Sequence, residues 1–168
     1  PIQSISLVND TEQERLLSKA LETNSPLKIE ASVLNLFDRH VKNNPNVTAV
    51  FYEGSALNYR ELDVKSNQLA HYLIETHFIK QGDVIAMLMD RSENLVIVAL
   101  AILKAGATYV PIDQKSPKDR IKTILEDAAP KLLIAEMYYG LDMDYYEGDK
   151  FFVDIQLEGI TTSESPVE

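Results

Sequence analysis

Hydrophobic and polar positions alternate along the chain in blocks that predict helices and strands in turn. Residues 83–89 form a short apolar run behind a glycine, which is typical of a buried strand. Similar short runs occur at 109–112, 131–135 and 151–155, and segments with helical periodicity separate the first three. Strands that alternate with helices imply a parallel sheet with right-handed crossovers. The pattern therefore predicts an α/β fold with a Rossmann-like parallel sheet.

The residues before this sheet predict a helical lead-in and a β-hairpin. Thr11 and Glu14 have the spacing of a capping box at the start of a first helix, and a second helix is expected over 32–42. Residues 47–57 read as two short strands around a tight Glu-Gly-Ser turn. Asn58 and Glu61 then form a second capping box, which starts the helix that follows the hairpin.

The two helices that connect the first three predicted strands have distinct start and stop signals. Ser92 is expected to cap the first, and Gly106 stands where its end requires a left-handed residue. Positions 95–103 of that helix are all apolar, so it should be buried on several sides, and a small sheet covers only one of them. Further protein is therefore expected to cover the rest. Ser116 and Pro117 predict the start of the second helix, with Ser as cap and Pro at the first helical position.

The same patterns divide the chain into three parts. Residues 1–30 read as an interdomain linker-like lead-in, and 31–157 hold the predicted hairpin and sheet. Residues 158–168 form a polar tail that is expected to be mobile.

Composition and charge exclude several classes of protein. The 168 residues have a formal net charge of −10, which argues against a nucleic-acid binder and against docking on an anionic membrane surface. The chain has no cysteine, so disulfides and thiolate chemistry are absent. No apolar run reaches the roughly 20 residues of a membrane span, and no secretory signal is visible. A cytoplasmic location is the expectation.

Searches for catalytic patterns find little. The six glycines are scattered, so no phosphate-binding glycine-rich loop is present. His40, His71 and His77 lack the spacing of a helical metal pair and are interpreted as surface or boundary residues.

A tyrosine-rich, acidic stretch covers residues 137–150. Its carboxylates do not match a calcium loop, so a solvated acidic loop is expected. Its tyrosines have no basic neighbours, so packing of the loop onto the domain is favoured over a platform that stacks bases. The residues concerned are Asp142, Asp144, Glu147 and Asp149, with Tyr138, Tyr139, Tyr145 and Tyr146.

Two stretches are more specific than these fold patterns. Residues 57–62 read LNYREL and residues 103–113 read LKAGATYVPID. They resemble the first two core motifs of the adenylation domains of nonribosomal peptide synthetases, with Asn58 and Thr108 as mild departures. The residues that we interpret as structural core motifs are Leu57, Asn58, Tyr59, Glu61, Leu62, Leu103, Lys104, Ala105, Gly106, Tyr109, Pro111 and Asp113.

The resemblance implies that the chain is the N-terminal, incomplete part of such a domain. The parent protein would use ATP and Mg²⁺ to convert an amino acid to aminoacyl-AMP, and would load it on a phosphopantetheine carrier. Partners would be the rest of the adenylation domain and neighbouring condensation and carrier domains. The family's phosphate loop, amino-acid pocket and catalytic lysine lie downstream of these motifs. We therefore expect no catalytic, cofactor-binding or metal-binding residue here, and no activity of the chain alone.

Lys104 could be suspected of contacting ATP. We interpret it instead as a basic residue in a last helical turn, where the helix dipole favours it.

Two other interpretations stay open at this point. The chain could belong to a fatty or aryl acid–CoA ligase, which shares much of the first motif. It could also be a non-catalytic α/β module that binds a partner protein. A parallel sheet that is cut from its domain exposes edges and an apolar face, so we expect the chain to self-associate.

Overall fold

The fold is described from a computed structural model, and it covers residues 9–21, 32–141 and 143–167. The chain divides into two compact units, Pro1–Ser32 and Val33–Glu168. In the first unit, helix α1 spans Asp10–Leu21, and the backbone N–H of Glu12 donates to Asn9 Oδ1 over 2.8 Å. Asn9 is therefore the cap, and the predicted Thr11 capping box is wrong because Thr11 already lies inside the helix.

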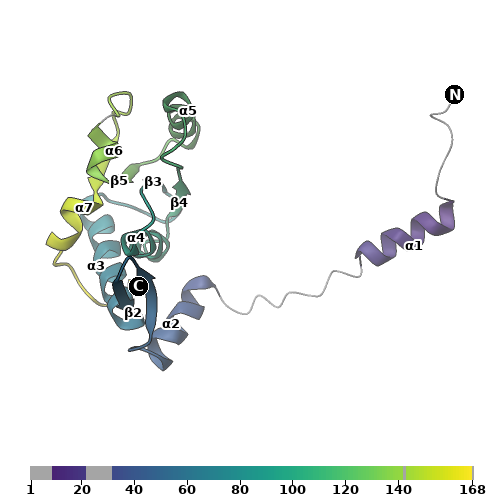
Figure 1. Cartoon of the computed structure of the whole chain (residues 1–168), viewed down its shortest axis with the longest axis horizontal. Coiled ribbons are helices and arrows are strands. Elements are labelled where there is room, and N and C mark those ends of the chain that lie inside the picture. The colour runs from purple at the N-terminus through teal and green to yellow at the C-terminus, as the bar shows by residue number, and fades with distance from the viewer. Residues whose placement is uncertain (1–8, 22–31, 142, 168) are drawn as a thin grey trace. The chain divides into compact units, whose positions relative to one another are not determined.

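The second unit holds all the strands of the described residues (Figure 1). Its elements are α2 (Val33–Asn43), β1 (Thr48–Tyr52), β2 (Ser55–Asn58), α3 (Tyr59–Thr76), β3 (Val84–Leu88), α4 (Glu93–Lys104), β4 (Thr108–Pro111), α5 (Lys118–Ala128), β5 (Leu132–Ala135), α6 (Met137–Leu141), β6 (Asp149–Phe152), α7 (Val153–Gln156) and the 3-10 turn η2 (Leu157–Gly159).

The four-stranded sheet has the order β4-β3-β5-β6, and every pair in it is parallel. This confirms the predicted α/β fold, and the antiparallel β1–β2 pair confirms the hairpin. One strand boundary was wrong. The expected strand over 151–155 ends at Phe152, because the Phe152 N–H donates to Gln156 Oε1 over 2.6 Å and the chain turns into α7.

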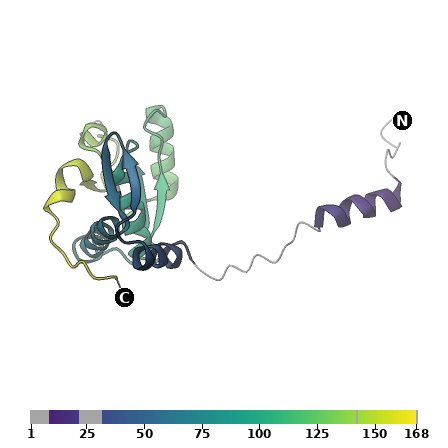
Figure 2. The same cartoon turned by 60° about the horizontal axis from the view of Figure 1, so that its bottom comes forward.

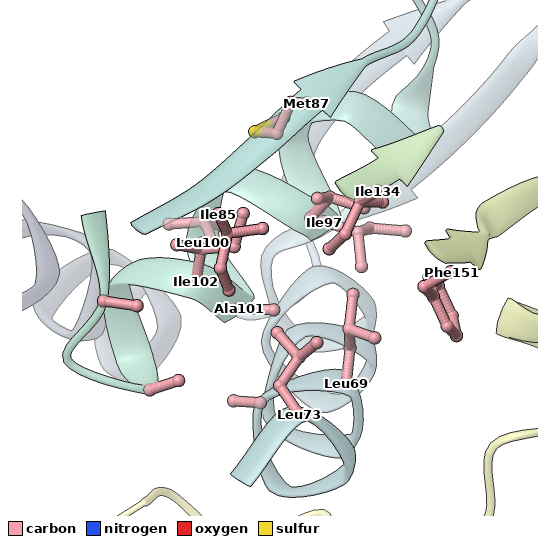
Figure 3. Packing of buried hydrophobic residues seen from close by; sticks show 14 of the residues in the cluster. Leu69, Leu73, Ile85, Met87, Ile97, Leu100, Ala101, Ile102, Ile134 and Phe151 are labelled. Atoms are coloured by element: carbon pink, nitrogen blue, oxygen red, sulfur yellow. The ribbon is translucent and has the colours of Figure 1, made fainter. Parts of the chain in front are cut away.

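Alternate residues of the central strands face two different layers. Ile85 and Ile134 face α3 and α4, while Ala86 and Leu133 face α5. Figure 3 shows Ile85 beside Leu100 and Ile102, and Ile134 beside Ile97, with Leu69 and Leu73 on the neighbouring helix α3. Side chains of a strand point alternately to opposite faces, so both faces of this sheet are covered by apolar side chains of helices.

Helix α4 is buried on several sides, as its sequence predicts. None of residues 95–103 is exposed, and α4 packs against α3, the hairpin and β4 (Figure 1). The expectation that further protein must cover it is wrong, because α3 and the hairpin of this chain already do so.

Two further helix starts, those of α4 and α5, differ from the expected caps. Ser92 precedes α4, but its hydroxyl is buried and makes no cap hydrogen bond. Pro117, not Ser116, is the N-cap of α5, because Pro117 is extended with ψ 145° and the helix starts one residue later than expected. Gly106 has a φ of +74°, so the left-handed residue after α4 is where the sequence predicts it.

The C-terminal residues contradict the expected mobile tail. Thr162 Oγ1 donates to the Gln68 carbonyl, and Asn67 Nδ2 donates to the Glu164 carbonyl over 2.9 Å. Residues 160–167 therefore run along α3, and Figure 2 shows this yellow segment ending near α2. Among the described residues, none of the helices is long and apolar enough to cross a membrane.

Candidate functional site

The first of the two distinctive stretches forms the junction between β2 and α3. Asn58 Oδ1 accepts from the Glu61 N–H over 2.9 Å, and Glu61 Oε2 accepts from the Asn58 N–H over 2.9 Å. This confirms the predicted capping box. Leu62 is buried in the main core, and Leu57 packs against that core from the hairpin. The polar groups of the junction are thus engaged in starting the helix.

Tyr59 joins this junction to helix α2. Its ring stacks on His40 with 5.3 Å between centroids, and it lies 6.0 Å from the ring of Phe37 at a tilt of 45°. Such ring pairs add to the burial of apolar area. Tyr59 therefore holds α2 against the start of α3.

The second stretch forms the turn from α4 into the edge strand β4. Gly106 takes the left-handed conformation, and its carbonyl accepts from the Gly82 N–H over 3.0 Å. Ala105 is the buried C-cap and Leu103 is half-buried. Tyr109 and Pro111 lie in β4, where the edge position tolerates a proline.

Asp113 closes the second stretch with a turn. Its Oδ1 accepts from the Lys115 N–H over 2.9 Å, and its carbonyl accepts from the Ser116 N–H over 2.9 Å. This side-chain turn leads the chain away from β4 toward α5.

Lys104 brings the two stretches together. Its ammonium donates to Asp63 Oδ1 over 2.7 Å, to Ser66 Oγ over 2.8 Å and to Asn67 Oδ1 over 2.7 Å, with the Asp63 carbonyl at 3.3 Å. The three acceptor residues belong to α3, which starts in the first stretch. Lys104 is the last residue of α4, which the second stretch ends. We call Lys104, Asp63, Ser66 and Asn67 the lysine cluster.

The lysine cluster is largely closed to solvent. The Lys104 side chain is 8% exposed, and its ammonium lies 5.2 Å from the centroid of the Phe37 ring. Burial lowers the pKa of Lys104, while the hydrogen bond to Asp63 opposes this shift. An ammonium group has three N–H donors, and all three are directed at oxygens of this chain. No donor of Lys104 is left for a phosphate.

The sequence alone does not reveal this cluster. Nothing in the sequence marks Asp63, Ser66 and Asn67 as partners of Lys104. The signal that could have found it is a set of polar residues three and four apart on a buried helix face, opposite a lysine in an apolar helix.

A second polar group lies at the carboxyl edge of the sheet. The chain leaves β3 toward α4 on one face and leaves β4 toward α5 on the other, which makes this edge a topological switch point. Asp90 receives hydrogen bonds from Gln114 Nε2 and, over 2.8 Å, from the Tyr139 hydroxyl. Its N–H donates to Glu136 Oε1 over 3.2 Å.

The electrostatics of this edge follow from those contacts. The hydrogen bond to Asp90 raises the pKa of Tyr139 to about 12, and burial raises the pKa of Glu136. A cavity of about 150 Å³ adjoins Gln114 and Tyr139 and is lined also by Leu88, Ile121 and Met143. No motif in the sequence marks Asp90, Gln114 or Glu136, although each follows a strand closely. Within the described residues, no three His, Cys, Asp or Glu side chains are grouped to hold a metal ion.

Another hollow, with a volume of about 520 Å³, lies away from both polar groups. It runs between the hairpin, α3 and the α7–η2 segment, and its walls include Leu57, Glu61, Val64, Leu69 and Leu157. Its lining mixes apolar and charged groups and includes no cluster of acids and bases in mutual contact.

The tyrosine-rich stretch packs onto the domain, as expected. Tyr139, Tyr145 and Tyr146 contact the core between the sheet and α5, and the Tyr146 hydroxyl donates to the Pro130 carbonyl over 3.2 Å. Tyr138 is exposed. Asp142, which was predicted in a solvated acidic loop, lies outside the described residues.

The three histidines occupy surface and boundary positions, as interpreted. His40 is exposed, and His71 is half-buried. His77 lies between Tyr72 and Phe151 with its Nε2 buried and unpaired, and burial lowers its pKa.

Relatives of known kind match most of the chain. Surfactin synthase subunit 2 of Bacillus subtilis is 39% identical over 140 residues, which is 83% of this chain and 4% of that protein. Surfactin synthase subunit 3 of the same organism is 38% identical over 160 residues, 93% of this chain and 12% of that protein. Gramicidin S synthase 2 of Brevibacillus brevis is 30% identical over 99% of this chain and 4% of its own length. The chain thus spans a small part of the curated relatives it matches.

Solved structures agree with this match. The N-terminal subdomain of NpsA from Klebsiella oxytoca, in complex with 3-hydroxybenzoyl-AMSN, has a TM-score of 0.72 and 26% identity, and the match covers 82% of this chain and 35% of that chain. The nonribosomal peptide synthetase FmoA3 has a TM-score of 0.71 and 26% identity over 79% of this chain and 14% of its own.

The family model described as AMP-binding enzyme matches residues 37–163, which include both distinctive stretches, the lysine cluster and the carboxyl-edge group. The chain belongs to the AMP-binding enzyme family, as part of the adenylation region of nonribosomal peptide synthetases.

Proposed function

We propose that the chain supplies the N-terminal scaffold of an adenylation domain. The single observation that supports this is that the polar side chains of the two family-like stretches form hydrogen bonds within the chain. Asn58 and Glu61 cap a helix, Lys104 binds α3, and Asp113 closes a turn. Residues committed to internal hydrogen bonds shape a fold rather than contact a substrate. The motif residues are thus proposed as structural, with none of them catalytic.

The whole protein is proposed to join an amino acid to ATP as aminoacyl-AMP and to load it on a phosphopantetheine carrier. NpsA fused to ThdA is an adenylation–PCP di-domain, and FmoA3 has a form with AMPPNP bound. The residues present do not fit ATP and Mg²⁺ by themselves, because Lys104 is saturated and the scattered glycines form no phosphate loop. We therefore assign nucleotide and metal binding to other parts of the protein.

A CoA ligase of fatty or aryl acids is the weaker alternative. The relatives that match most of this chain are synthetases of peptides such as surfactin and gramicidin S. The NpsA subdomain holds an anthranilyl analogue, so aryl acids are included among the substrates of the test below. A non-catalytic binding module has less support, because the chain belongs to an enzyme family.

ATP–pyrophosphate exchange tests the scaffold proposal. The purified 168-residue chain should show no exchange above a no-protein control with any proteinogenic amino acid or with benzoate-type acids. A longer protein in which these residues are continued by the rest of an adenylation domain should exchange with an amino acid and should not form an acyl-CoA. Exchange by the chain alone would show that it is not only a scaffold, and acyl-CoA formation would support the ligase.

Two further properties are proposed for the chain in isolation. The edge strands β4 and β6 each pair on one side among the described residues, which favours self-association through a sheet edge. Light scattering that reports only monomer at millimolar concentration would contradict this. A cytoplasmic location is proposed because the reaction uses ATP.

A further inference from the structure

Residues 160–167, which we call the C-terminal strap, are attached to α3 by hydrogen bonds. Some of the donors lie on the strap and others lie on α3. Thr162 Oγ1 donates to the Gln68 carbonyl, Asn67 Nδ2 donates to the Glu164 carbonyl over 2.9 Å, and His71 Nε2 lies 3.0 Å from the Ser165 carbonyl. The end of the strap, at Pro166 and Val167, lines a cavity of about 90 Å³ together with Lys104 and Asp63. The strap therefore lies directly beside the lysine cluster.

Asn67 belongs to both structures. Its Oδ1 accepts from Lys104 over 2.7 Å while its Nδ2 donates to the strap, and the residue is only 1% exposed. An ammonium group can only donate, so it requires the amide oxygen on its own side. The opposite orientation would set the NH₂ group against the ammonium and the amide oxygen against the Glu164 carbonyl. Neither contact is a hydrogen bond, and both would be buried.

We infer that Lys104 is a positioning residue for the C-terminal strap, acting through Asn67. The ammonium fixes the direction of the Asn67 amide, and the amide fixes the strap backbone on α3. Lys104 thereby couples the end of α4 to the path of the chain beyond residue 160. The inference concerns this chain alone and does not depend on the proposed enzymatic activity.

Proteolysis of the 168-residue chain by a Glu-specific protease tests the inference, with products identified by mass. A cut after Glu164 reports release of the strap, because Glu164 lies at its centre. A cut after Glu93, in the first turn of α4, reports opening of the core. The measured quantities are the two cutting rates, compared separately between each variant and the wild-type chain.

Three variants separate a positioning role from general stabilisation. Asn67→Asp keeps an acceptor for Lys104 and replaces the donor to the strap by an oxygen, and Asn67→Leu serves if that variant does not fold. Lys104→Met removes the ammonium and keeps the length of the side chain. Lys131→Met is the matched control, because Lys131 forms a 2.7 Å ion pair with Asp83 and contacts no strap residue.

Asn67→Asp and Lys104→Met should each raise the rate of the cut after Glu164 by about tenfold, as expected for the loss of one buried hydrogen bond. Lys131→Met should leave that rate unchanged. Acceleration of both cuts by the same factor in Lys104→Met would overturn the inference, since the strap would then be released only when the core opens. So would a faster cut after Glu164 in Asn67→Asp without one in Lys104→Met, because Asn67 would then hold the strap unaided.

Discussion

Two lysine–aspartate pairs in this chain have the same length and different surroundings. Lys104 and Asp63 are 2.7 Å apart, with side chains 8% and 21% exposed. Lys131 and Asp83 are also 2.7 Å apart, with side chains 38% and 27% exposed. The first pair joins two buried helices, and the second joins the starts of β5 and β3 at the amino edge of the sheet.

The difference shows that distance does not set the contribution of an ion pair. The hydrogen bond from Lys131 is the main cause that lowers the pKa of Asp83, so the more exposed pair gains from the attraction itself. Burial is the main cause that lowers the pKa of Lys104, so the buried pair bears a cost of desolvation that its hydrogen bonds offset. Removing one partner therefore has unequal consequences.

Lys104→Met should have the largest effect, a loss of about 3 kcal/mol in the free energy of unfolding. The substitution keeps the apolar stem but leaves the buried Ser66 and Asn67 without their ammonium donor, and Asp63 without its counter-charge. Urea unfolding followed by circular dichroism measures the change. A loss below about 1 kcal/mol would contradict the description of the cluster as a closed network.

The double variant Lys104→Met, Asp63→Leu separates the cost of an unpaired charge from the value of the pair. Replacing both partners by apolar groups is often neutral. The double variant should therefore recover most of the stability that Lys104→Met loses. If the double variant and Lys104→Met lose the same free energy of unfolding, the charge on Asp63 is not the source of the effect.

Ser66→Ala should have the next largest effect, about 1 kcal/mol. The Ser66 hydroxyl is fully buried, donates to the Asp63 carbonyl over 3.0 Å and accepts from Lys104. Ser18→Ala is the matched control, because Ser18 makes the same bond to the carbonyl three residues earlier but is exposed on α1. Urea unfolding should show no measurable change for Ser18→Ala. Equal effects for the two serines would mean that burial adds nothing.

Local chemistry explains how much of the fold could be predicted. The sheet strands, the hairpin and the Asn58 capping box follow from residues near one another in the sequence, and the structure confirms them. The strand expected over 151–155 was wrong because the Gln156 side chain, outside the apolar run, turns the chain at Phe152. A pattern of apolar residues contains no information on such a capping contact.

The lysine cluster could not be predicted for a different reason. Its partners lie 37 to 41 residues from Lys104 in the sequence, so it exists only once α3 and α4 pack together. The helix dipole accounts for a basic residue at the end of α4 and says nothing about its burial. The strap was missed likewise, because its polar composition suggested mobility, whereas its backbone carbonyls are held by side chains of α3.

Lys131→Met should shift the urea midpoint by roughly a third or less of the shift that Lys104→Met causes, since partly exposed pairs contribute little. The shift should also vanish in concentrated salt, which screens exposed charges, while the shift for Lys104→Met should persist. Lys122→Met is the control for a fully exposed pair, because Lys122 and Glu126 are 3.8 Å apart on the surface of α5. A Lys131→Met effect that equals that of Lys104→Met would break the comparison.

The smallest expected effect is a dependence on pH. The wild-type chain and Lys104→Met differ in the free energy of unfolding, and this difference should change as the pH is raised. Burial lowers the pKa of Lys104 in the folded chain below its ordinary value of 10.5. At a pH between the lowered pKa and 10.5, the unfolded chain therefore binds more protons than the folded chain. Stability that depends on this lysine therefore rises with pH as 10.5 is approached from below. Urea unfolding of both proteins at several alkaline pH values measures the drift, and the subtraction removes the other titrating groups. A fall of this difference with pH would mean that attraction to Asp63, rather than burial, governs the Lys104 ammonium.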